Sequence, residues 1–121
     1  KQLLNKAADI AITPDGSTVY ASNRGRHNSV CVFDVLSDGS LEQVMHVDAP
    51  AFPRAMRLAG EGSLLLVAGQ ERGIVQTFFT RTHDPDGKLT FSGTSVAGPP
   101  TTAALTVMKL VEPEEGGDAQ G

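Results

Sequence analysis

Arginine, histidine and amide side chains occur where two apolar runs of the chain end and where a third begins. Arg24 and His27 follow the first run, Arg54 begins the second, and Gln70 follows the third. A guanidinium group is a planar fork of donors that binds two oxygens of a carboxylate or phosphate at once. A histidine can accept or donate a proton near neutral pH. These residue types predict a site for a small anionic ligand, with a candidate for acid–base chemistry beside it.

Each of these residues also has a structural interpretation that involves no ligand. Arg26, Glu71 and Arg72 can be solvated loop charges, and a loop histidine such as His27 is more often exposed to solvent than catalytic. Three scattered histidines and one cysteine give no metal-ligand spacing, so we expect no metal and no cofactor. Cys31 lies in an apolar run and is expected to be a small core residue.

The composition limits the classes of protein to consider. The chain has 121 residues, a formal net charge of -4 and 40% hydrophobic residues, which is typical of a globular domain. It has no basic run and no apolar run of membrane-spanning length, so we expect neither a nucleic-acid partner nor a membrane. A single cysteine cannot form an internal disulfide, which favours a reducing, cytoplasmic location. Because the first residue is not Met, we expect the chain to begin inside a longer protein or to be processed.

An internal repeat shows which elements position the candidate residues. Three segments recur in the same order and with the same apolar pattern. The matched pairs are residues 8–23 with 54–69, residues 28–33 with 73–78, and residues 38–41 with 86–89. One structural unit is therefore present twice.

The pattern of each copy predicts four short strands separated by turn residues. The predicted strands span residues 8–13, 18–23, 29–35 and 41–47 in the first copy, and 54–59, 64–69, 74–80 and 88–96 in the second. A period of about 45 residues with four strands is the spacing of a β-propeller blade. We therefore predict an all-β chain with two consecutive four-stranded antiparallel blades. Such blades need neighbours, so the partners we expect are further blades or a second copy of the chain.

The repeat also predicts the boundaries within the chain. Residues 1–52 and 53–100 each form one blade. Residues 101–111 contain one more alternating apolar segment, which we expect to be a strand that closes the ring of blades. Residues 112–121 are acidic and rich in glycine, and we expect them to be a disordered tail.

Meandering strands send alternate connections to opposite ends of a blade. The loops after the second strand of each copy and the link between the copies fall at one end. Arg24, His27, Arg54 and Gln70 should therefore converge there, although they are far apart in sequence. The opposite end collects Asp-Gly turns, whose glycines supply positive φ and whose aspartates close the turn.

Several segments resemble one known family. The carrying motifs are Tyr-Ala-Ser-Asn-Arg-Gly at residues 20–25, preceded by Thr-Pro-Asp-Gly at 13–16, with Phe-Pro-Arg at 52–54 and Leu-Leu-Val-Ala-Gly-Gln at 65–70. In order and spacing, over about residues 4–110, the chain resembles the C-terminal part of the lactonase-type seven-bladed β-propellers. That family includes the bacterial 6-phosphogluconolactonases and the fungal 3-carboxy-cis,cis-muconate lactonizing enzymes.

The resemblance implies a small anionic lactone or carboxylate ligand and metal-free chemistry at one mouth of the channel. Arg24 matches an arginine of the family motif, which implies a catalytic and substrate-binding role. Arg54 and Gln70 match segments that imply substrate binding, although Gly69 departs from the usual Asn. His27 is the candidate catalytic base on the same face.

Three functions stay open at this stage. The first is hydrolysis of a sugar lactone in carbohydrate metabolism, the second is lactone formation by a muconate-type cycloisomerase, and the third is ligand or protein binding without turnover. We expect the 121-residue chain alone to be inactive, because most of the site, including the other catalytic groups of the family, is expected to lie in further blades.

Overall fold

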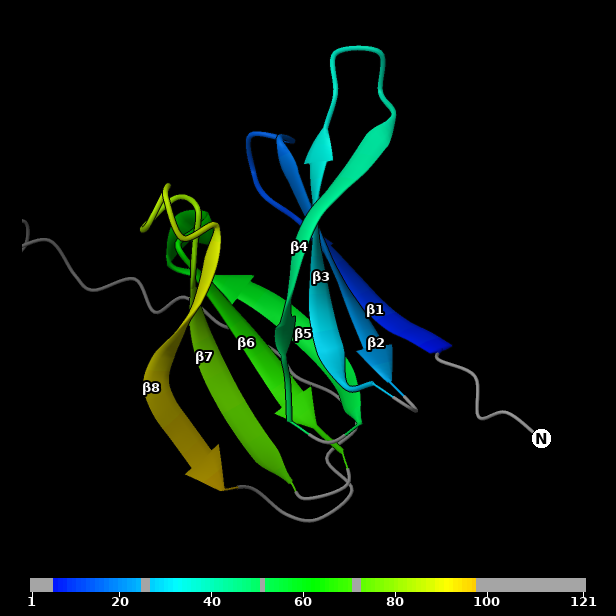
Figure 1. Cartoon of the computed structure of the whole chain (residues 1–121). Coiled ribbons are helices and arrows are strands. Elements are labelled where there is room, and N and C mark those ends of the chain that lie inside the picture. Colours follow the sequence, from blue (N-terminus) through cyan, green and yellow to red (C-terminus); the bar gives the residue numbers. More distant parts are fainter. Residues whose placement is uncertain (1–5, 25–26, 51, 71–72, 98–121) are drawn as a thin grey trace, which may run out of the picture.

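The computed structural model describes residues 6–24, 27–50, 52–70 and 73–97 and contains two four-stranded antiparallel sheets (Figure 1). The first sheet pairs its strands in chain order: β1 (Lys6–Ile12), β2 (Thr18–Arg24), β3 (Ser29–Val35) and β4 (Leu41–Asp48). The second sheet repeats this order: β5 (Pro53–Ala59), β6 (Leu64–Gly69), β7 (Ile74–Thr80) and β8 (Leu89–Ala97). A short 3-10 helix, η1 (Gly60–Gly62), joins β5 to β6.

The sheets confirm the predicted all-β fold and its repeat of four strands. Strands β3, β6 and β7 have the predicted bounds, whereas β1 begins earlier, at Lys6, and β8 ends later, at Ala97. The predicted ring-closing strand, residues 101–111, and the predicted tail, residues 112–121, lie outside the described residues.

Aspartate and glycine form the tight turns at one end of the first sheet. Asp15 Oδ1 accepts hydrogen bonds from the Thr13 hydroxyl at 2.7 Å and from the Ser17 main-chain N–H at 3.0 Å. Gly16 has a φ of 75°, a conformation that disfavours a side chain. We call this end of the sheets, with the β1–β2, β3–β4 and β7–β8 hairpins, the turn end.

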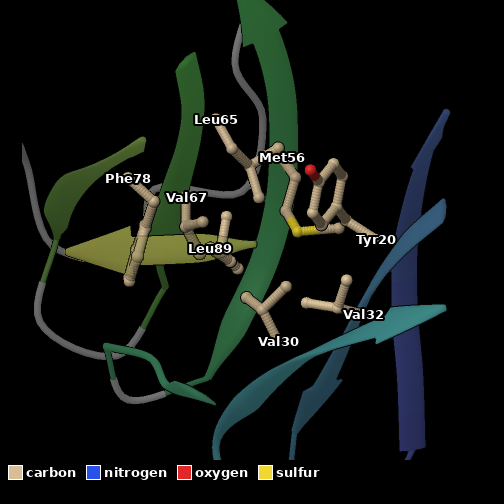
Figure 2. Packing of buried hydrophobic residues seen from close by; sticks show 8 residues of the cluster. All are labelled: Tyr20, Val30, Val32, Met56, Leu65, Val67, Phe78 and Leu89. Carbon is tan, nitrogen blue, oxygen red and sulfur yellow. The ribbon is translucent and has the colours of Figure 1, made fainter. Parts of the chain in front are cut away.

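The hydrophobic core lies between the two sheets (Figure 2). Along each strand, alternate side chains point to opposite faces, so one face of each sheet is apolar where the sheets meet. Figure 2 shows Tyr20 of β2 and Met56 of β5 directed toward one another from opposite sheets. The buried cluster consists of Tyr20, Val30, Val32, Met56, Leu65, Val67, Phe78 and Leu89.

The two sheets converge along one edge and separate toward the other. Strand β5 contacts both β1 and β2, and we call this contact the seam. Near β4, β7 and β8 a groove of about 460 Å³ separates the sheets, with Val47, Phe78 and Phe91 among its lining residues. This wedge shape is the arrangement of neighbouring propeller blades, with β1 and β5 as the innermost strands.

Equivalent positions in the two sheets differ sharply in exposure. Ile10 and Ile12 of β1 are 60% and 56% exposed, whereas Met56, at the position in β5 that matches Ile10, is 1% exposed. Leu58, which matches Ile12, packs against the core. Met56 is buried because the first sheet covers it, and nothing in the described part of the chain covers Ile10.

Candidate functional site

Three connections meet at the end of the sheets opposite the turn end, which we call the loop end. The Asn28 carbonyl accepts the Ala49 N–H at 3.0 Å, and its side-chain Oδ1 accepts the Phe52 N–H at 3.2 Å. The Phe52 carbonyl in turn accepts the Gln70 N–H at 2.8 Å. These bonds tie the β2–β3 loop, the β4–β5 link and the β6–β7 loop together, as the strand order predicts.

An open cavity of about 290 Å³ crosses the seam near the loop end. Its lining comes from both sheets and consists of Ala7, Ala8, Asp9, Arg24, Arg54, Ala55 and Arg57, and we call it the arginine cleft. Three guanidinium groups face one carboxylate in this set, and the other members are alanines. The lining therefore carries net positive charge and leaves room for a ligand between small side chains.

Two β-bulges place charged residues at the cleft. The register of β1 with β2 shifts between Ala7 and Ile10, so Asp9 lies in a bulge, and its N–H donates to the Ser22 hydroxyl at 3.0 Å. The register of β5 with β6 shifts between Pro53 and Ala55, which makes Arg54 the extra residue. A bulge redirects a side chain from the regular alternation of a strand, and the residues of both bulges line the cleft, one from each sheet.

The carboxylate of Asp9 joins the two sheets at the cleft. Its Oδ2 accepts the Met56 main-chain N–H at 2.9 Å and contacts Arg57 Nη1 at 3.1 Å, and its Oδ1 accepts the Ile10 N–H at 2.8 Å. Arg57 Nη1 also donates to the Met56 carbonyl at 2.7 Å. The Asp9 side chain is 25% exposed and the Arg57 side chain 47%, so the carboxylate is the more shielded partner of this ion pair.

Arg24 and Arg54 keep donors for a ligand. Arg24, the last residue of β2, is half-buried, and its Nε is buried without a hydrogen-bond partner among the described residues. Within the same described ranges, no protein group accepts a hydrogen bond from the exposed guanidinium of Arg54. A buried N–H that lacks a partner is costly, and an anion in the cleft would supply one.

The structure places the other two predicted site residues elsewhere at the loop end. His27 lines a second cavity, of about 250 Å³, on the face of the first sheet that points away from the second sheet, together with Cys31 and His46. Gln70 lies in the β6–β7 loop, where its main chain bonds to Phe52. The arginine cleft thus brings together Arg24 and Arg54 but not His27 or Gln70.

Sequence reasoning missed two residues of the cleft, Asp9 and Arg57. A signal for both is present in the repeat, because Asp9 aligns with Ala55 and Arg57 aligns with Ala11. Each position carries a small apolar residue in one copy and a charge in the other. A charge that is present in one copy and absent from the other is not needed to form the blade. This difference between the copies could have identified Asp9 and Arg57 as candidate site residues.

The cleft can bind and polarise an anion, but its described lining holds no histidine, cysteine or glutamate. The one carboxylate, that of Asp9, is already engaged by three donors. A general base for water is therefore absent from the described lining. The arrangement fits charge stabilisation and ligand orientation.

The two sheets are arranged as neighbouring propeller blades, and comparison with known proteins identifies the family. Residues 2–106 match the family described as "Lactonase, 7-bladed beta-propeller". The chain belongs to this family.

Individual relatives carry related descriptions. A 6-phosphogluconolactonase of Formosa agariphila is 40% identical over 75 residues, which cover 58% of this chain and 21% of that protein. An uncharacterised protein of Staphylococcus aureus is 36% identical over 87 residues, which cover 70% of this chain and 25% of that protein.

Solved structures resemble the same two sheets. A crystal structure described as a putative 6-phosphogluconolactonase from Bacteroides fragilis superposes with a TM-score of 0.76 and 28% identity, covering 85% of this chain and 28% of that one. The periplasmic gluconolactonase of Pseudomonas aeruginosa gives a TM-score of 0.71 and 26% identity, covering 84% and 28%. The chain spans less than a third of the length of each of these proteins.

Proposed function

We propose that this chain is part of a propeller enzyme that hydrolyses an anionic sugar lactone, such as 6-phosphogluconolactone. The observation that carries the proposal is the arginine cleft at the loop end of a lactonase-family propeller. The descriptions of the Formosa agariphila and Bacteroides fragilis relatives support this substrate class.

The proposed reaction adds water to the lactone carbonyl carbon and breaks the ring C–O bond. A base accepts a proton from water as the tetrahedral oxyanion forms, and the ring oxygen takes up a proton as it leaves. Arg24 and Arg54 bind the anionic group or the oxyanion, because fixed guanidinium donors stabilise negative charge that develops in the transition state. The donors that Arg24 and Arg54 keep within the described chain support this role.

The catalytic roles of His27 and the binding role of Gln70 stay predictions. His27 lies outside the arginine cleft, so in this proposal it acts only if residues from further blades extend the site toward the second cavity. His27→Gln in the full-length protein should then lower kcat at least tenfold and leave KM within twofold. An unchanged kcat would assign the base to another residue.

We propose further blades as the partner of this chain. Ile10 and Ile12 form an exposed apolar face at positions whose counterparts in the second sheet are covered by a neighbouring blade. A preceding blade would bury them in the same way.

The location is also a proposal. No helix in the described part of the chain is long and apolar enough to cross a membrane. We propose the cytoplasm because the sequence has one cysteine, although the Pseudomonas aeruginosa neighbour is described as periplasmic. Cell fractionation with an antibody to the chain tests this location.

The test of the function is turnover by the full-length protein. Purified protein is mixed with 6-phosphogluconolactone, and base consumption is followed at constant pH against the spontaneous rate. We expect hydrolysis well above that background. Cyclisation of a carboxymuconate without lactone hydrolysis would replace the proposal with a cycloisomerase, and no turnover of either substrate would favour a binding protein.

A further inference from the structure

We propose that Asp9 is a positioning residue of the arginine cleft, which holds Arg57 against the seam and leaves the ligand's anionic group to Arg24 and Arg54. The inference rests on the proposed binding of an anionic substrate in this cleft. It adds a residue that acts through another side chain and that limits how tightly the cleft holds an anion.

The contacts of Arg57 carry the first step. One nitrogen, Nη1, lies 3.1 Å from Asp9 Oδ2 and 2.7 Å from the Met56 carbonyl oxygen. Asp9 Oδ2 also accepts the Met56 N–H at 2.9 Å. The Asp9 carboxylate is thus bound to the N–H of Met56, and the Arg57 guanidinium is bound to the carbonyl of the same residue. Arg57 cannot turn fully toward a ligand without leaving both acceptors.

The fixed position of Asp9 carries the second step. Its N–H is bound to the Ser22 hydroxyl at 3.0 Å, and its Oδ1 accepts the N–H of Ile10 at 2.8 Å. The bulge in β1 therefore leaves this carboxylate little freedom to move. An aspartate held in this way is positioned to keep Nη1 of Arg57 beside it when an anion enters the cleft.

The charge balance of the cleft gives the third step. With Nη1 of Arg57 paired to Asp9, Arg24 and Arg54 are the guanidinium groups of the cleft that form no ion pair among the described residues. A cleft with three accessible guanidinium groups would bind the anionic substrate more tightly, and it would also bind the anionic product more tightly. Binding energy that substrate, product and transition state share does not raise kcat.

The experiment is a double-mutant cycle in the full-length protein, with inorganic phosphate as the probe and calorimetry as the readout. Asp9→Asn retains an oxygen that accepts the Met56 N–H but removes the charge that holds Arg57. We expect phosphate to bind about fivefold more tightly to this variant, because a charged guanidinium becomes available. In the Arg57→Ala background, the same substitution should raise the affinity by less, because no Arg57 guanidinium is left for it to release.

Asp34→Asn is the matched control. Asp34 pairs with Arg81 at 2.6 Å at the turn end, so its loss removes the same charge and a similar ion pair outside the cleft. Phosphate affinity should stay within about twofold of the wild type.

Steady-state kinetics with 6-phosphogluconolactone add a readout that a merely structural role would not move. Asp9→Asn should lower both KM and kcat about threefold, because substrate and product are both held more tightly. Equal effects of Asp9→Asn on phosphate binding with and without Arg57, or no effect at all, would overturn the inference. Absence of lactone turnover with the expected phosphate cycle would instead overturn the proposed function and leave the anion cleft standing.

Discussion

The Asp9 carboxylate accepts the main-chain N–H of Met56 at 2.9 Å, across the seam between the two sheets. Met56 belongs to β5, the innermost strand of its sheet, and the edge of β5 that faces away from β6 has no strand partner among the described residues. One side chain from the first blade therefore satisfies the backbone of the second blade at the wall of the arginine cleft. The geometry of the cleft and the packing of the blades depend on the same contact.

Burial at the seam predicts a large loss of stability for Met56→Ala. Met56 is 1% exposed in the buried cluster, so truncation should lower the free energy of unfolding by about 2–5 kcal/mol. Ile10→Ala is the matched comparison, because Ile10 is 60% exposed in this chain. In the 121-residue chain it should cost less than about 0.5 kcal/mol.

The same pair of variants tests the proposed preceding blade. In the full-length protein, Ile10→Ala should cost about 2 kcal/mol or more, because its counterpart Met56 is buried by the equivalent contact. Urea unfolding measures both values. An Ile10→Ala cost that stays small in the full-length protein would contradict a covering blade.

The buried hydroxyl of Tyr20 leads us to predict a loss of stability at high pH. Its hydroxyl is buried near Thr80 and the main chain of Arg81, yet no partner among the described residues meets hydrogen-bond geometry. Burial raises the pKa of Tyr20 above 10.0, its ordinary value. The folded state thus disfavours the charged form of Tyr20, so this side chain ionises in the unfolded chain before it ionises in the folded one. The free energy of unfolding is therefore unaffected by Tyr20 below about pH 10 and falls as the pH rises above that value.

The test uses the single tyrosine of the chain. Absorbance of tyrosinate should appear in the folded 121-residue chain only above the pH at which it appears in urea. Tyr20→Phe should remove the alkaline fall in stability that this residue causes. Titration at the same pH in both states would contradict the buried hydroxyl.

The hydrogen bonds of the Asp15 carboxylate lead us to predict part of the loss of stability in acid. Hydrogen bonds from the Thr13 hydroxyl and from Ser17 hold the pKa of Asp15 below its ordinary value of 3.8. Its contribution to stability is therefore present above that pH and is lost as pH falls through the lower folded value. Asp15→Asn should make the melting temperature decline less steeply below about pH 4. A decline as steep as that of the wild type would count against these hydrogen bonds.

The fold could be predicted further than the site, for physical reasons that particular residues show. Alternation of apolar residues and Asp-Gly turns is local, so β3, β6 and β7 were predicted with their observed bounds. The convergence of Arg24 and Arg54 followed from the strand order alone. The pairing of Asp9 with Met56 and Arg57 did not, because it depends on a bulge in β1 and on the distance between two blades. His27 was placed at the correct end, but the face to which its loop turns was not predictable from the spacing.

The most direct test of the account compares three arginine variants of the full-length protein. Arg24→Ala and Arg54→Ala remove guanidinium groups from the cleft, whereas Arg81→Ala removes one from the ion pair at the turn end. The measurement is KM for 6-phosphogluconolactone. Each cleft variant should raise KM at least tenfold, in line with the loss of a charge-assisted hydrogen bond worth about 1.5–3 kcal/mol, and Arg81→Ala should leave it within twofold. A KM that changes equally in all three variants, or in none, would contradict an anion-binding role for the cleft.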